Sequence, residues 1–176
     1  MTGTGQARIA PVESVPATLR EVMARFATGV TVLTATGEHT HGMTANAVTS
    51  VSLDPPLVLC CVARTARMHA AITSARHFGI SVLGADQQDL ARYFADKRRP
   101  SGRAQFDAVD WEPGPCTGAP LLTGSPAWLE CELTELHEGG DHTIFLGSVL
   151  RSVRGVAGPG LVFYDGAFRP VPPRED

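Results

Sequence analysis

Strand-like segments follow one another along this sequence without the long helices that connect parallel strands. Segments rich in β-branched or apolar residues lie at 30–36, 41–53, 57–63, 78–83, 127–138, 142–153 and 161–171. Strands joined by short turns pair in an antiparallel manner, whereas parallel strands need long crossover connections. The pattern therefore predicts a mainly β fold, a small antiparallel barrel with a few short helices at its edges.

Turn residues and apolar runs refine this prediction. The residues at 37–40 read as a turn, and Asp165-Gly166 is a strong hairpin signal. The segment 57–63 is apolar on both faces, which is typical of a central strand. Residues 100–126 are rich in Pro and Gly and predict a region that is mostly loop.

The first predicted helix begins near residue 18. Thr18 and Glu21 have the spacing of a capping box, and Gly29 suits the left-handed position that ends a helix. The apolar residues recur on one face at helical spacing, and they are Leu19, Val22, Met23 and Phe26. The sequence therefore predicts an amphipathic helix at the start of the ordered chain.

Two further short helices are expected between strands. One covers 64–75 with Thr65 as its N-cap, and the other follows Asp86 and ends in the basic residues at 97–99. We expect residues 1–17 to form a flexible N-terminal arm, 18–171 to form the domain and 172–176 to form a short tail.

Composition places the chain among soluble globular proteins of one domain. Of its 176 residues, 43% are hydrophobic and 19% are charged, with a net charge of −3. This balance predicts binding neither to nucleic acid nor to a membrane surface, and no apolar run is long enough to span a bilayer. No secretory signal is recognised at the N-terminus, so we expect a cytoplasmic protein.

Neither the cysteines nor the histidines predict a metal site. Cys60, Cys61, Cys116 and Cys131 fit no zinc or disulfide spacing, so free buried thiols are expected. His39 and His41 would share one face near a hairpin tip. They could form a metal pair, but solvated hairpin histidines are the preferred interpretation.

The segment 41–53 is unusually polar for a strand. If it is one extended strand, one face carries Thr44, Asn46, Val48, Ser50 and Ser52. A solvated barrel exterior would explain this stripe. A ligand cradle is the alternative, because neutral donors and acceptors suit a flat heteroaromatic ring with a polyol chain.

A possible anion site follows shortly afterwards. Arg64 and Arg67 flank Thr65 at the expected start of a helix. Free amides and the positive dipole end at such a start attract anions, although two solvated arginines would also explain the pattern. A neutral polar strand followed by a phosphate site has the order of parts of a flavin nucleotide.

Several motifs together are similar to one family, the flavin reductase components of two-component flavin-dependent monooxygenases. They are "FATGVTVLTA" (26–35), "HGMTANAVTSVSLDPPLVLCCV" (41–62), "ARTARMH" (63–69), "FGISVL" (78–83), "DLARYFADK" (89–97) and "GDHTIFLGSV" (140–149). The resemblance implies a split β-barrel of the FMN-binding type that forms a homodimer. It further implies that NADH or NADPH reduces FMN or FAD, and that reduced flavin then passes to a separate monooxygenase.

The resemblance also assigns site residues. The cofactor-binding residues that it implies are Thr44, Ala45 and Asn46 at the ring, Ser50, Val51 and Ser52 at the ribityl chain and phosphate, Ala63, Arg64 and Thr65 at the phosphate end, and Phe94 and Lys97 nearby. His142 matches the family's histidine near the nicotinamide and is the candidate catalytic residue. No metal is implied.

Two alternatives remain open. One is a flavin- or haem-binding split-barrel module without NAD(P)H turnover, and the other is a tightly flavinylated oxidase of the pyridoxamine-phosphate-oxidase-like type. The resemblance favours NADH over NADPH, but the sequence does not decide between FMN and FAD. Nor does it identify the partner oxygenase or the role of residues 100–126.

Overall fold

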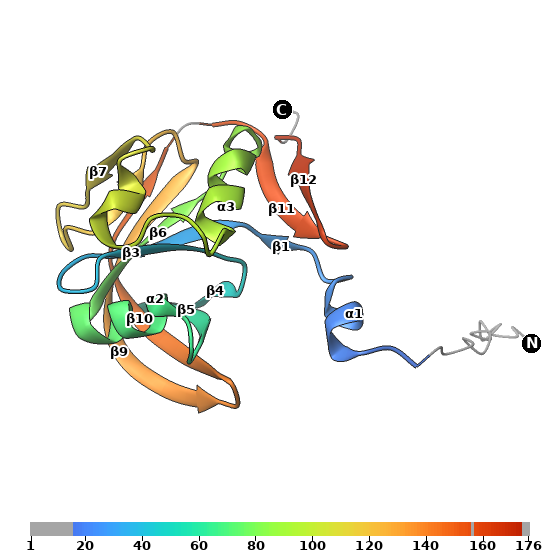
Figure 1. Cartoon of the computed structure of the whole chain (residues 1–176), viewed down its shortest axis with the longest axis horizontal. Coiled ribbons are helices and arrows are strands. Elements are labelled where there is room, and N and C mark those ends of the chain that lie inside the picture. Colours follow the sequence, from blue (N-terminus) through green and yellow to red (C-terminus); the bar gives the residue numbers. More distant parts are fainter. Residues whose placement is uncertain (1–15, 156, 174–176) are drawn as a thin grey trace, which may run out of the picture.

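The computed structural model describes residues 16–155 and 157–173, and Figure 1 shows a curved β body with short helices around it. Residues 1–15 of the predicted arm and 174–176 of the predicted tail lie outside the described residues. The predicted mainly β fold with few short helices is confirmed. No helix among the described residues is long and apolar enough to cross a membrane.

One antiparallel sheet forms most of the body. Its strands are β2 (Thr31–Ala35), β3 (His41–Ala45), β4 (Val48–Leu53), β5 (Pro56–Ala63), β6 (His77–Val82), β9 (Ala127–Gly139) and β10 (His142–Arg154). Their order across the sheet is β3-β2-β6-β9-β10-β5-β4. Neighbouring strands along the sheet pair antiparallel throughout, as the short connections predict.

The two edges of this sheet are joined by only two residues. β3 and β4 lie at opposite ends of the strand order, yet Asn46 and Ala47 alone connect them. The amide of Cys61 donates to the carbonyl of Ala47 over 2.9 Å, which fastens this connection to β5. Because so short a segment spans both edges, the sheet must curl back on itself. The curl explains the barrel-like body in Figure 1.

The prediction of one continuous strand over 41–53 is therefore wrong. The chain leaves its pairing with β2 after Ala45 and starts a new pairing with β5 at Val48. A side-chain stripe running from Thr44 to Ser52 does not exist, because the bend between the strands interrupts the alternation. The polar residues of 41–53 are instead divided between β3 and β4, which lie at opposite edges of the sheet.

The core lies inside the curl and against the helices. One apolar cluster centres on Leu33, Phe78 and Phe145, and a second centres on Phe94 and Phe106. The predicted central position of the 57–63 strand is confirmed, because β5 pairs with β10 on one side and with β4 on the other. Its two faces are not equally covered, since burial alternates along the strand between buried and half-buried positions.

The helices are shorter than predicted. The capping box of Thr18 and Glu21 is confirmed, but α1 covers only Leu19–Met23. Gly29 does not end it, because Thr28–Gly29 form strand β1, which pairs with β11. None of the residues of α1 is buried, so its apolar face has no partner among the described residues.

The other two helices begin at different residues from those predicted. Helix α2 covers Arg67–Ala75, and its N-cap is Ala66 rather than Thr65. Helix α3 covers Gln88–Ala95 and follows a short 3₁₀ turn at Ala85–Gln87. Asp86, the expected N-cap of α3, lies inside that turn. The N-cap of α3 is therefore Gln87.

One predicted loop region contains more regular structure than expected. The segment 100–126 is mostly turns and irregular structure, as predicted, but it includes a 3₁₀ helix at Gly102–Phe106 and the hairpin of β7 (Trp111–Pro113) with β8 (Pro120–Leu122). Apolar residues such as Leu122, which is fully buried, hold it against the core.

The C-terminal hairpin is confirmed. β11 (Gly160–Tyr164) and β12 (Ala167–Val171) pair around Asp165-Gly166, whose φ angles of 50° and 75° are those of a tight hairpin turn. With β1 this hairpin makes a small second sheet beside α3 (Figure 1).

The cysteines are free in the described residues, as predicted, but they are not all buried. Cys60 and Cys131 are fully buried, Cys61 is half-buried and Cys116 is exposed. Burial raises the pKa of Cys60 and of Cys131 to about 12, so both remain neutral thiols that pack in the core.

Candidate functional site

Three cavities lie in a row along β3, and together they are called the trough. The central cavity has a volume of about 460 Å³ and is lined by His41, Met43, Thr44, Ala63, Thr65, Ala66, Arg67, Phe94, Ala95, Lys97 and Arg99. The aromatic cavity, of about 190 Å³, shares Thr44 and Ala95 with it. The turn cavity, of about 240 Å³, shares His41 and Arg67 with it.

Helix α3 forms one wall of the central cavity because Gly42 lets it approach β3 closely. A Cβ atom at Gly42 would lie 2.6 Å from a ring carbon of Phe94 and 3.0 Å from Phe106. The hydroxyl of Thr44 donates to the carbonyl of Ala91 over 2.7 Å, which ties the same helix to the strand. The wall is therefore positioned by a glycine and a partly buried hydrogen bond.

The central cavity carries a concentration of positive charge. Arg67, Lys97 and Arg99 line it, and among the described residues no carboxylate forms a salt bridge with any of the three. Helix α2 begins here at Arg67, and its N-cap Ala66 provides no side-chain hydrogen bond to the first-turn amides. Cations beside uncapped amides favour a phosphate group at this place.

Arg99 also fixes the shared wall between the central and turn cavities. Its guanidinium lies 3.1 Å from Nε2 of His41 and donates to the carbonyl oxygens of Gly42 and Asp96. Burial, with the charges of Arg99 and Arg67, lowers the pKa of His41 to about 4, so this ring is neutral at neutral pH. Because Arg99 engages Nε2, His41 does not form the metal pair considered with His39. The described residues hold no cluster of three or more metal-ligating side chains.

The aromatic cavity has a different character. Its lining contains no charged side chain and consists of Val30, Thr44, Asn46, Ala95, Phe163 and Phe168. The rings of Phe163 and Phe168 meet edge to face with centroids 5.4 Å apart. Such a cavity suits a flat, largely uncharged ring system.

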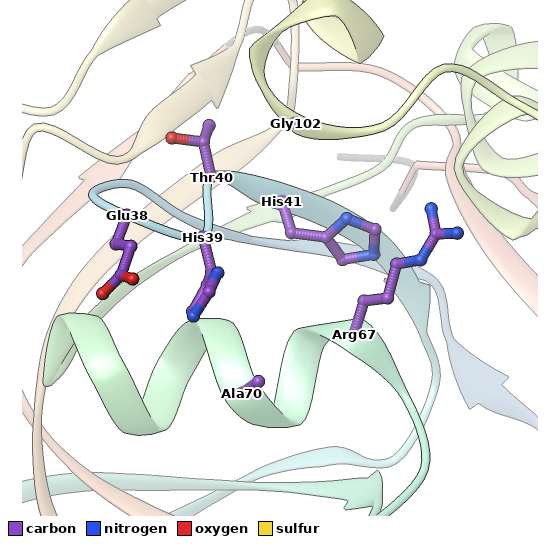
Figure 2. Close-up of a pocket in the computed structure, with 7 residues that line it drawn as sticks. All are labelled: Glu38, His39, Thr40, His41, Arg67, Ala70 and Gly102. Atoms are coloured by element: carbon purple, nitrogen blue, oxygen red, sulfur yellow. The ribbon is translucent and has the colours of Figure 1, made fainter.

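The turn cavity lies between the β2–β3 turn and helix α2. Figure 2 shows Glu38 and His39 reaching from the turn towards the helix that carries Ala70, while Arg67 of the same helix extends beside His41. Gly102, from the 3₁₀ segment, closes the side opposite the helix. This end of the trough therefore combines a carboxylate, an imidazole and an arginine.

Six of the residues predicted to bind the cofactor line the trough. They are Thr44, Asn46, Ala63, Thr65, Phe94 and Lys97. The other five are Ala45, Ser50, Val51, Ser52 and Arg64, and none of them lines these three cavities. Ala45 is buried with its carbonyl accepting from Thr31, and the three residues of β4 lie on an edge strand.

The sequence reasoning missed some residues of the site. Arg99 was recognised only as one of the basic residues after a helix, and its contact with His41 had no local signal because 58 residues separate the two. Phe163 and Phe168 did have one. A two-residue turn at Asp165-Gly166 makes them cross-strand partners, as they are in the structure.

His142 lies at one end of the site and outside the three cavities. It is the first residue of β10 and pairs with Ala63, which lines the central cavity. Its Nδ1 is 2.8 Å from Oδ1 of Asp141, and this hydrogen bond lowers the pKa of that carboxyl. With 45% of its side chain exposed, the ring is available to a second ligand.

The chain is similar in sequence to known flavin reductases. The family model described as "Flavin reductase like domain" matches residues 23–172. The NADH-dependent FAD reductase of Streptomyces globisporus is 52% identical over 158 residues, covering 90% of this chain and 87% of the relative. The FMN reductase (NADH) SmoA of Agrobacterium fabrum is 46% identical, covering 85% and 82%.

Solved structures are similar over almost the same length. BorF, the flavin reductase component of a bacterial two-component tryptophan halogenase, has a TM-score of 0.85 at 48% identity, covering 89% of this chain and 98% of its own. The NADH:FAD oxidoreductase SgcE6 of Streptomyces globisporus, in complex with NAD and FAD fragments, has a TM-score of 0.83 at 51% identity, covering 90% and 93%.

Proposed function

The chain belongs to the flavin reductase-like family and is an NAD(P)H-dependent flavin reductase, and we propose that the trough is its flavin site. The observation that carries this proposal is the order of the cavities. An uncharged aromatic cavity adjoins a central cavity that carries three cations and a helix start. A flavin nucleotide has the same order, with the ring system at one end and the phosphate at the other.

The residues present fit such a ligand. Arg67, Lys97 and the first-turn amides of α2 hold the phosphate, while Arg99 stays engaged with His41 and Gly42. Thr44, where the central and aromatic cavities meet, and Asn46, in the aromatic cavity, contact the ring. When bound, the flavin accepts a hydride from the nicotinamide, so the chemistry belongs to the two cofactors.

The protein's part is placement and exclusion of water. Hydride transfer requires the two ring systems to stack at about 3–3.5 Å, so small errors of position cost rate. The lining of the aromatic cavity carries no cation. This cavity would therefore give little electrostatic stabilisation to a negative charge on the reduced ring. The reduced flavin is accordingly released readily.

His142 orients the nicotinamide in this proposal. It stands beside Ala63 at the margin of the central cavity, with Asp141 hydrogen-bonded to its Nδ1. No proton has to be removed to start hydride transfer, so the ring acts through contact and not as a general base.

The enzyme works as a homodimer in this proposal. Leu19, Val22, Met23 and Phe26 of the α1 region are 52–77% exposed, and Leu53 on edge strand β4 is 90% exposed. Apolar side chains gathered on a helix that stands away from the body, as α1 does in Figure 1, favour burial against a second copy. The contacts expected of Ser50, Val51 and Ser52 with the flavin stay a prediction.

The released flavin reaches a separate monooxygenase by diffusion. BorF and the HsaB proteins are named as reductase components or subunits, which supports such a partner for this chain. Free thiols on the described residues support a reducing, cytoplasmic setting.

Steady-state oxidation of NADH with excess free FMN or FAD tests the function. A flavin reductase turns over many flavin equivalents without an organic substrate. A flavin- or haem-binding module would bind its cofactor and show no NADH turnover. A tightly flavinylated oxidase would need its own substrate, and neither result would fit the proposed release of reduced flavin.

A further inference from the structure

The turn cavity has no role in binding the ring or the first phosphate of the flavin. Resting on the proposed function, we propose that this cavity binds the adenosine half of FAD, so that the enzyme prefers FAD to FMN. FMN ends at its phosphate, whereas FAD continues through a second phosphate to ribose and adenine. The cavity continues the trough in that direction.

Arg67 connects the two parts. It lines both the central and the turn cavities, and none of the hydrogen bonds or salt bridges among the described residues engages its side chain. Its planar guanidinium can therefore bridge two successive phosphate groups through parallel hydrogen bonds. Arg99 cannot replace it, because that side chain already holds His41 and the carbonyl of Gly42.

His41 makes the passage between the cavities rigid and uncharged. It is 7% exposed and is also shared by both linings. Its ring is fixed by Arg99, and burial keeps it neutral at neutral pH. The positive charges near the passage are therefore those of Arg99, which is engaged with His41, and of Arg67, whose side chain is left for the second phosphate.

The lining beyond Arg67 suits a nucleoside. Glu38 offers a carboxylate that can accept hydrogen bonds from the two ribose hydroxyls, and the His39 ring offers a flat face for adenine. Ala70, which lies between His39 and Arg67 in Figure 2, leaves this part of the cavity open because its side chain is a single methyl group. A further phosphate at this place would meet the negative charge of Glu38, so the cavity suits an unmodified adenosine.

NADH also carries an adenosine, but the position of the cavity favours the flavin's. The turn cavity adjoins the phosphate site directly through Arg67 and His41. The nicotinamide must instead lie over the flavin ring, at the other end of the trough. The two sources of adenosine predict different kinetic effects, which allows them to be separated.

The test fills the cavity and measures flavin binding directly. Dissociation constants for FAD and FMN are determined by fluorescence titration of the full chain without NADH, for the wild type, Ala70→Trp and Glu38→Gln. Thr73→Trp is the matched control, because Thr73 is exposed on the same helix but does not line the cavity. Circular dichroism checks that every variant is folded.

We expect the wild type to bind FAD about tenfold or more tightly than FMN, which corresponds to about 1.4 kcal/mol. Ala70→Trp should reduce this ratio to about threefold or less, Glu38→Gln should reduce it partly, and Thr73→Trp should preserve it. Equal affinities of the wild type for FAD and FMN would overturn the proposal. So would an unchanged ratio in folded Ala70→Trp.

NADH kinetics complete the test. With FMN as the acceptor, Ala70→Trp should not raise the KM for NADH more than Thr73→Trp does. A selective increase would assign the cavity to the adenosine of NADH and overturn the proposal. Absence of NADH oxidation with either flavin would instead contradict the proposed function, whatever the binding ratio shows.

Discussion

The guanidinium of Arg99 holds the ring of His41 at the wall shared by the central and turn cavities. Nη2 of the arginine lies 3.1 Å from Nε2 of the histidine, although 58 residues separate them in the sequence. The same arginine approaches the ring of Phe94, with its Cζ atom 5.8 Å from the ring centroid. One side chain therefore joins β3, helix α3 and the segment after it around the site.

The neutral state of His41 predicts a pH dependence of stability. Its pKa is lowered to about 4 in the folded protein, so between about pH 6.5 and 4 the unfolded chain binds a proton that the folded chain does not. Stability from this residue is present above that range and is lost as the pH falls through it. As the pH falls from 7 to 5, the free energy of unfolding of His41→Gln should decrease by about 2 kcal/mol less than that of the wild type.

Urea unfolding at the two pH values measures this difference. Carboxylates titrate in both proteins and cancel in the comparison. Parallel losses in the wild type and His41→Gln would show that His41 does not contribute.

The phosphate site predicts different effects of two neighbouring arginines. Arg67 lines the central cavity, whereas Arg64 is exposed and lines none of the three cavities. Arg67→Ala should weaken FMN binding by about 1.5–3 kcal/mol and riboflavin binding much less, because riboflavin has no phosphate. Arg64→Ala is the matched control and should change both affinities little. Equal losses for FMN and riboflavin in Arg67→Ala would remove the phosphate role.

The proposed role of His142 predicts a selective effect on the second ligand. His142→Ala should raise the KM for NADH and slow hydride transfer by about tenfold to a hundredfold, because the nicotinamide loses a positioning contact. Flavin affinity should remain close to that of the wild type. Stopped-flow reduction of bound flavin measures both quantities, and unchanged values would reduce His142 to a turn residue.

Close packing at Gly42 predicts a structural effect at the site wall. In Gly42→Ala the new methyl group would meet the fully buried ring of Phe94, so helix α3 must shift. We expect a loss of about 1–3 kcal/mol in stability by chemical unfolding. Gly29→Ala is the control, since a Cβ atom there has no neighbour within 4 Å. Similar losses in both variants would contradict the packing argument.

The exposed apolar residues predict a dimer. Phe26 is 66% exposed and Leu53 is 90% exposed. Phe26→Glu and Leu53→Glu should each shift the protein towards the monomer, because burial of a charge in an apolar interface is unfavourable. Light scattering of the wild type and variants gives the mass. A fully active monomeric wild type would refute the proposed homodimer.

Local patterns were enough to predict many elements. Strand β2, the Thr18–Glu21 capping box and the Asp165-Gly166 turn depend on residues close together in sequence, and all three are confirmed. Helix starts were less accurate. Thr65 and Asp86 are ordinary capping residues, but backbone geometry imposed by neighbouring strands and turns moved the caps to Ala66 and Gln87.

The candidate site was predicted only in part for the same reason. Local sequence patterns were sufficient to predict the polar residues of β3, the cations near α2 and the run of antiparallel strands. The bend between Ala45 and Val48, which joins opposite edges of one curled sheet, arises only when the whole sheet assembles. That curl is set by pairing between strands far apart in sequence, which no local pattern encodes. It separates Ser50 from Thr44 and brings Arg99 to His41, because side chains meet where the folded sheet places them.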